Sequence, residues 1–97
     1  MHTVAETEQF IKMADKIWSE EEREEFIEFI SNTPNAGKLI VGAEGARKVR
    51  WTSKGTGKSG GVRVITWIQI KDTVTLIAIY KKSRRSTMKA HEIKKVK

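Results

Sequence analysis

The stretch GVRVITWIQIKDTVTLIAIYKK, residues 61–82, decides the fold of this 97-residue chain. β-Branched and aromatic residues dominate its two halves, residues 61–70 and 73–82, which is the composition of β-strands. Only Lys71 and Asp72 separate the halves, and a two-residue connection forces two strands into an antiparallel hairpin. The longest apolar run, residues 76–80, is far shorter than the roughly 20 residues that a membrane span needs. We therefore expect an antiparallel β-hairpin within a globular domain.

More strands are predicted on the N-terminal side of this hairpin. Residues 39–41 and 46–52 have strand composition, and residues 1–6 resemble a short strand. A basic loop rich in glycine and lysine, residues 53–61, joins the strand at 46–52 to the hairpin.

The acidic N-terminal part has helical spacing instead. Apolar residues recur every three or four positions between residues 8 and 18, which predicts a first helix. Ser19 and Glu22 match a capping box that starts a second helix, and the segment 32–34, which contains Pro34, ends it. We expect the acidic side of this helical hairpin to face solvent. Another short helix is predicted from Thr87.

These elements predict an α+β fold in one domain, residues 1–97. Its helical hairpin packs on a twisted antiparallel sheet of about four strands, followed by the short C-terminal helix. The absence of cysteine excludes disulfides and thiolate zinc sites. His2 and His91 lie at opposite ends of the chain, without metal-ligand spacing, so we expect no metal and no other cofactor. No signal-peptide pattern is present, which favours a cytoplasmic protein.

Charge is distributed unevenly along the chain. Residues 1–35 hold three basic and nine acidic residues, a net charge of −6, whereas residues 36–97 hold sixteen basic and three acidic residues, a net charge of +13. This asymmetry favours a polyanion-binding surface built from the second part of the chain. Gly57, Lys58 and Ser59 do not make a nucleotide phosphate loop, because Thr52 stands where that motif needs its first glycine.

The predicted strands carry cations at positions that share a face. Alternation places Lys48 and Arg50 together on the strand at 46–52, with Arg47 on the opposite face. Arg63, near the start of the next strand, is flanked by valines and costs free energy to bury without an anionic partner. Two interpretations remain open from these features alone: a phosphate-handling site, or a basic rim whose side chains reach water.

Four segments together resemble the HigB-type branch of the RelE toxin superfamily: NTP at 32–34, RKVRW at 47–51, GKSGGVRVI at 57–65 and IYKK at 79–82. Order and spacing agree from about residue 10 to residue 96. The resemblance implies a compact microbial ribonuclease fold that enters the ribosomal A site and cleaves messenger RNA. It also implies a neutralising antitoxin, often a helix-turn-helix protein, through which the toxin reaches operator DNA. No membrane partner is implied.

The resemblance assigns roles by position. Arg63 matches the arginine that stabilises the transition state, and Lys48 and Arg50 match a basic pair, with Lys48 as our candidate general base. Lys82 matches a basic residue after the last strand. We predict that six further cations contact RNA or the ribosome: Arg47, Lys54, Lys58, Lys81, Arg84 and Arg85.

The sequence departs from the family at the acid step. Met88 stands where several members carry a catalytic tyrosine or histidine, and His91, on the same predicted helical face, is our candidate substitute. Thr66 also replaces a frequent tyrosine. The alternative hypothesis is therefore a catalytically inert RNA- or ribosome-binding module of the same fold. A third is a regulatory protein that acts mainly in complex with its antitoxin on operator DNA.

Overall fold

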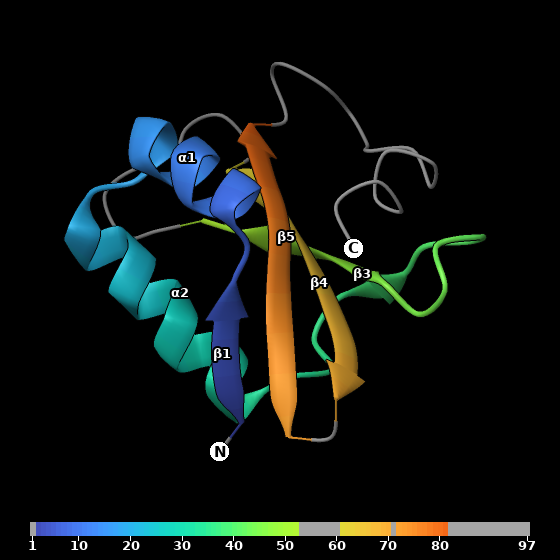
Figure 1. Cartoon of the computed structure of the whole chain (residues 1–97). Coiled ribbons are helices and arrows are strands. Elements are labelled where there is room, and N and C mark those ends of the chain that lie inside the picture. The colour runs from blue at the N-terminus through green and yellow to red at the C-terminus, as the bar shows by residue number, and fades with distance from the viewer. Residues whose placement is uncertain (1, 53–60, 71, 82–97) are drawn as a thin grey trace.

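The computed structural model describes residues 2–52, 61–70 and 72–81, which form two helices and five strands (Figure 1). The elements, in chain order, are β1 (Thr3–Glu6), α1 (Glu8–Ile17), α2 (Glu20–Asn32), β2 (Lys38–Leu39), β3 (Arg47–Trp51), β4 (Val62–Ile70) and β5 (Thr73–Lys81). The strands form one sheet in the order β1-β5-β4-β3-β2. The α+β class is confirmed, whereas the predicted C-terminal helix lies outside the described residues.

The sheet is mixed, which corrects the antiparallel sheet of about four strands that the sequence predicted. β1 pairs in parallel with β5, with Val4 opposite Val74, while the other three pairings are antiparallel. A long connection makes this parallel pairing possible, because both helices and the other three strands lie between β1 and β5 in the sequence. β1 therefore closes one edge of the sheet and β2 the other.

The predicted β-hairpin is confirmed as β4 and β5, the two longest strands. Val64 lies opposite Ile79 and Ile65 opposite Ala78, with register irregularities toward the turn. Asp72 in the turn has a φ of 67°, a left-handed conformation that aspartate tolerates better than most residues. Both hairpin strands are therefore central, and each pairs with a neighbour on its other side.

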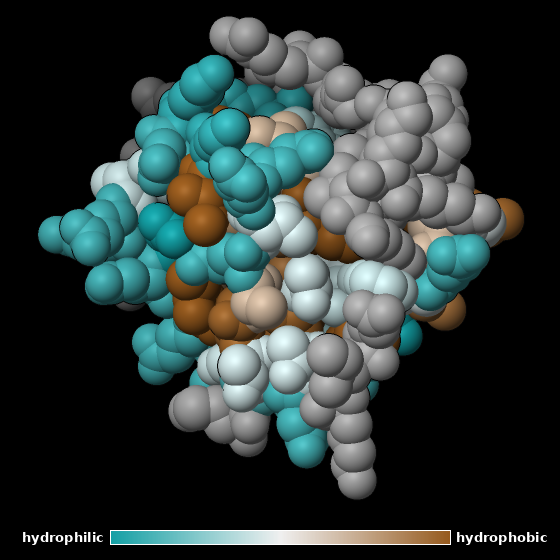
Figure 2. All heavy atoms as spheres, in the orientation of Figure 1, coloured by the Kyte–Doolittle hydropathy of each residue, from teal (hydrophilic) through white to brown (hydrophobic). Residues whose placement is uncertain are grey.

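Capping side chains fix where the two helices begin, as the sequence predicted for α2. Ser19 Oγ accepts a hydrogen bond from the Glu22 backbone N–H at 3.2 Å, and Glu22 Oε1 accepts one from the Ser19 N–H at 2.9 Å. Such reciprocal bonds satisfy two of the free N–H groups at a helix N-terminus. Hydrophilic side chains cover much of the helical side of the molecule (Figure 2). α2 exposes the acidic residues Glu20, Glu21, Glu24, Glu25 and Glu28, which confirms the predicted solvent-facing side.

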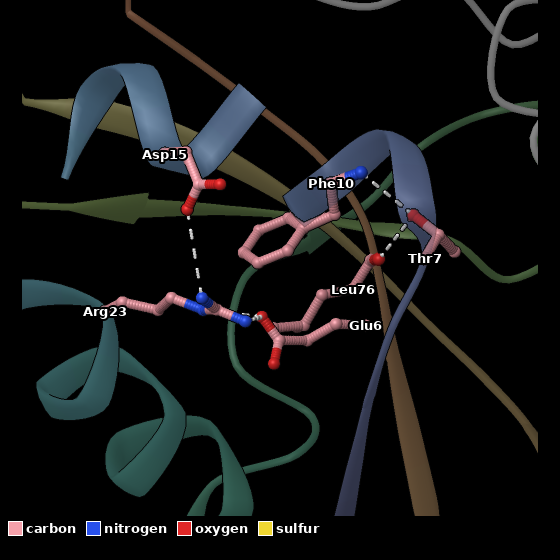
Figure 3. A network of polar contacts seen from close by, with 6 residues as sticks. All are labelled: Glu6, Thr7, Phe10, Asp15, Arg23 and Leu76. Atoms are coloured by element: carbon pink, nitrogen blue, oxygen red, sulfur yellow. Dashed lines mark hydrogen bonds and ion pairs between the residues drawn. The ribbon is translucent and has the colours of Figure 1, made fainter. Parts of the chain in front are cut away.

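A polar network fastens both helices to β1 and β5 (Figure 3). Arg23 of α2 donates from Nε to Glu6 Oε2 at 2.7 Å, and its Nη1 lies 3.9 Å from Asp15 Oδ1 of α1. Thr7 Oγ1 donates to the Leu76 carbonyl at 3.0 Å and accepts from the Phe10 N–H at 3.1 Å, so it both caps α1 and binds β5. The N-terminal third of the chain is thus attached to the last described strand.

The predicted strand at 39–41 is wrong beyond Leu39. The chain turns over residues 40–46, where the Ile40 N–H donates to the Ala46 carbonyl at 2.9 Å. Gly42 and Gly45 take positive φ values of 78° and 94°, which favour glycine and end the extended conformation. Val41 is consequently 95% exposed.

Apolar residues fill both faces of the sheet. Helix residues such as Phe10, Phe26 and Ile30 pack with Val64 and Leu76 on one face. On the other face, Ile65, Ile77, Ala78 and Tyr80 form a second buried cluster. Neither helix of the described part is long and apolar enough to cross a membrane.

Candidate nucleic-acid interface

A groove of about 490 Å³ lies beside β3 and gathers four cations. It is lined by Phe29, Ala36, Gly37, Lys38, Lys48, Val49, Arg50 and Arg63. Three of the cations, Lys48, Arg50 and Arg63, are residues for which the sequence predicted a catalytic role. The groove volume is in the range of small-ligand sites, about 300–1,000 Å³.

The strand register sets these cations directly opposite one another. Lys38 of β2 faces Lys48 of β3, and Arg50 of β3 faces Arg63 of β4. Residues opposite each other in antiparallel strands have Cα atoms about 4.5–5.5 Å apart, and like charges at this separation destabilise a sheet. Two such like-charge pairs border one groove, so positive charge is concentrated where a polyanion could bind.

Arg63 is the most deeply placed of the four, since only 6% of it is exposed. Its neighbours Val62 and Val64 are buried in the helix-facing core, and alternation puts Arg63 on the opposite face of β4. Its Nη1 donates to the Val62 carbonyl at 3.4 Å, a long contact. Burial at this depth does not fit the interpretation in which a basic rim simply reaches water.

Lys48 and Arg50 line the same groove but are more accessible. Lys48 is half-buried, and Arg50 is exposed at the groove surface. A row of fixed cations from three adjacent strands can hold a phosphodiester and balance negative charge that develops on it. No group of three or more His, Asp or Glu side chains suited to a metal ion occurs in the described ranges.

The remaining predicted site residues do not join this groove. Arg47 lies on the other side of β3, where its Nη1 donates to the Gly37 carbonyl at 3.1 Å. Lys81 is exposed at the end of β5 and borders a different pocket with Met13 and Lys16. The other predicted residues lie outside the described ranges: Lys54, Lys58, Lys82, Arg84, Arg85 and His91.

The sequence did not reveal one cation and one aromatic residue of the groove, Lys38 and Phe29. Lys38 precedes the predicted strand at 39–41, and only the register opposite Lys48 reveals its place. Phe29 lies on α2 and contacts Phe26 and Trp51. The i, i+3 spacing of Phe26 and Phe29 indicated a shared face but not a groove at its border.

Gly37 permits the close approach that forms one groove wall. Its φ is +91°, and a Cβ at this position would lie 2.4 Å from the Lys48 carbonyl oxygen and 3.0 Å from Val49 Cγ2. Because backbone cannot yield as a flexible side chain can, any larger residue here would push the 33–38 segment away from β3.

Both tryptophans of β3 and β4 have structural contacts. The Trp51 ring lies 4.8 Å from Phe29 and 5.3 Å from Phe26, between centroids. Trp67 Nε1 donates to the Glu44 carbonyl at 3.1 Å and so holds the 40–46 turn against β4. Packing therefore accounts for both side chains without a bound base.

Comparison with known proteins identifies the architecture. No protein-family model matches the sequence. The structure is similar to that of a mutant of the E. coli toxin RelE in the free state, with a TM-score of 0.63 and 18% identity over 98% of this chain and 92% of the other. The chain has the RelE fold. A second similar structure belongs to the intact E. coli RelBE toxin-antitoxin complex, with a TM-score of 0.60 and 19% identity over 84% of this chain and 96% of that one.

The RelE fold thus confirms the predicted architecture independently of the sequence motifs. At this level of identity the similarity concerns the fold, and chemistry must be argued from the residues of the groove. The strands β3 and β4 that carry three of the cations are two of the five strands of the sheet.

Proposed function

We propose that this protein is the toxin of a type II toxin-antitoxin system, a ribosome-dependent endoribonuclease that cleaves translated messenger RNA. The observation that carries the proposal is the presence of two like-charge cross-strand pairs around one groove of a RelE fold. In these pairs Lys38 lies opposite Lys48, and Arg50 lies opposite Arg63. Like charges directly opposite one another destabilise a sheet. A phosphodiester bound in this groove would be attracted to all four cations.

The proposed reaction is attack of a ribose 2′-oxygen on the adjacent phosphorus. The 2′-hydroxyl proton passes to a base, the P–O5′ bond breaks, and the products are a 2′,3′-cyclic phosphate and a protonated 5′-oxygen. Lys48, half-buried beside the phosphate position, is the proposed base, and Arg63 with Arg50 stabilises charge on the phosphoryl oxygens. His91 remains our candidate acid for the leaving oxygen, and Lys82 remains a predicted catalytic cation. These residues supply the proton transfers and the charge stabilisation that the step needs without a metal.

The proposed partners follow from the resemblance and the fold. The ribosomal A site would present the message, in the cytoplasm, and the HigB-type branch implies a helix-turn-helix antitoxin that also carries the complex to operator DNA. The similar RelBE structure is a toxin-antitoxin complex, which supports an antitoxin for this chain as well.

The test is to map new 5′ ends on cellular messages after brief induction of the wild type, Arg63→Gln and Lys12→Ala. Glutamine is chosen because Arg63 is buried and alanine would leave a cavity there. Lys12 is an exposed cation of α1 and serves as the matched control. We expect cuts inside reading frames for the wild type and Lys12→Ala, and none for Arg63→Gln.

Two outcomes would contradict the proposal. Cuts that persist unchanged in Arg63→Gln would exclude this groove as the active site. Folded wild type that binds ribosomes but produces no new ends would favour the inert binding module.

A further inference from the structure

Phe29 brings an aromatic ring to the cationic groove. Its ring packs against Trp51 at 4.8 Å and Phe26 at 6.2 Å between centroids, so neighbours on both α2 and β3 restrain it. The residue is nevertheless only half-buried, and it lines the groove together with Lys38 and Arg50. A restrained ring that stays accessible beside several cations has the two components of a single-stranded nucleic-acid site, a stacking surface and phosphate contacts.

We propose that Phe29 is the platform of a nucleobase subsite, on which an unpaired base of the RNA stacks while the adjacent phosphate lies against Arg50 and Arg63. This inference rests on the proposed function for the identity of its ligand as RNA. It adds Phe29 of α2 and a stacking contact with a base, neither of which the proposed cleavage reaction requires.

The open edge of β3 lets one nucleotide reach both parts of the groove. β2 pairs only with Arg47 and Lys48, and within the described ranges no strand pairs with the outer edge of residues 49–51. Alternation puts Arg50 on one side of β3, and Val49 and Trp51 on the other, toward α2. An RNA backbone lying on the Arg50 side can therefore send a base over the edge toward Phe29.

Two small residues form one wall of the groove that this base would enter. Ala36 and Gly37 form the wall between the end of α2 and β3, and Gly37 lies so close to the Lys48 carbonyl that no side chain fits. The groove's volume of about 490 Å³ suits a ligand of nucleotide size. Base recognition by stacking accepts every base, since each has a π-face, so we expect the subsite to add affinity with little sequence preference.

The experiment compares two fluorescent 2′-O-methyl RNA oligonucleotides of equal length, which cannot be cleaved through the 2′-oxygen. One carries all its bases, and the other is abasic at its central positions but has the same phosphates. Affinities are measured by fluorescence anisotropy at low salt for the wild type, Phe29→Leu, Phe29→Tyr and Arg50→Gln. Leucine keeps an apolar contact with Trp51 but removes the π-face, whereas tyrosine keeps it.

We expect the wild type and Phe29→Tyr to prefer the complete strand to the abasic strand by about tenfold. Phe29→Leu should lose that preference and bind both strands as the wild type binds the abasic one. Arg50→Gln should weaken binding to both strands by the same factor, because phosphates are equally present in each.

The inference is overturned if the wild type does not distinguish the strands, or if Phe29→Leu keeps the full preference. A loss of affinity in Phe29→Leu that is equal for both strands also overturns it, since that result indicates altered packing. Failure of the proposed function would show differently, as a preserved base preference in this assay with no cut messages in cells.

Discussion

Two arginines, Arg23 in the helical hairpin and Arg63 in the sheet, have different charged neighbours. Arg23, in the helical hairpin, contacts Glu6 at 2.7 Å and lies 3.9 Å from Asp15, so its charge is matched by carboxylates (Figure 3). Arg63, in the sheet, faces another arginine across the strand pair and is nearly buried. The first arrangement joins three elements of the fold, whereas the second places like charges where they repel.

This difference indicates that the charges of the helical hairpin contribute to stability, whereas those of the groove are available for function. Carboxylates dominate residues 1–35 and cations dominate residues 36–97, and the four cations that line the groove all come from the second part. Within the described residues, the acidic side chains of α2 face solvent on the helical side, away from the cation-lined groove. The following predictions test this separation of the acidic and cationic regions.

The largest effect is expected where the two regions join. Phe26 is fully buried between Trp18 of the helical hairpin and Trp51 of β3, with ring centroids 5.3 Å from each. Phe26→Ala should lower the free energy of unfolding by about 3–5 kcal/mol, measured by chemical denaturation. A loss below about 1 kcal/mol would mean that the two regions are not held together through this ring.

Reversing one charge of the groove should change function and stability in opposite directions. Arg50→Glu places a carboxylate opposite Arg63, so we expect RNA affinity to fall by at least about tenfold while the free energy of unfolding rises by about 0.5 kcal/mol. Anisotropy and denaturation on the same preparation measure both. A variant that loses stability together with affinity would contradict the expected repulsion between Arg50 and Arg63.

Removing Arg23, which is paired with carboxylates, should lower stability without changing RNA affinity. Arg23→Met leaves Glu6, whose side chain is 19% exposed, without its 2.7 Å partner and should lower the free energy of unfolding by about 1 kcal/mol. RNA affinity should stay unchanged. The double variant Glu6→Gln with Arg23→Met isolates the pair by a thermodynamic cycle, and additivity there would show that the contact contributes nothing.

The smallest effect is expected for Lys12, which lies 3.8 Å from Glu8 on the surface of α1. Lys12→Ala should change the free energy of unfolding by less than about 0.5 kcal/mol. It should also leave the salt dependence of RNA binding unchanged, whereas Lys38→Ala should reduce the slope of log affinity against log salt by about 1. Equal slopes for Lys38→Ala and the wild type would remove Lys38 from the phosphate contacts.

Local patterns in the sequence were sufficient for the elements whose partners lie nearby. The hairpin of β4 and β5 follows from two strand-like segments and a two-residue connection, and the start of α2 follows from Ser19 and Glu22. The parallel pairing of β1 was not predictable in this way. A four-residue strand carries no mark of a partner about seventy residues later.

The candidate site was predicted in part for the same reason. Alternation placed Lys48 and Arg50 on one face, and the register then brought Arg63 opposite Arg50. Lys38 was missed because the loop that carries Gly37 back to β3 sets its position, and Phe29 because its place at the groove depends on how α2 packs against β3. The error at Val41 has a local cause, since the glycines on either side of Glu44 turn the chain.

The pairing of β1 with β5 also has a consequence for the newly made chain. Thr7 donates to the carbonyls of Leu76 and Ile77, contacts that span about 70 residues, so the first strand cannot dock until the last described strand has been synthesised. Domains fold as units when their distant contacts become available, and topologies with such contacts fold late. During translation the cationic strands β3 and β4 therefore leave the ribosome before the sheet can close around them. Under the proposed function, this order delays a nuclease from becoming active beside the ribosome that is still producing it.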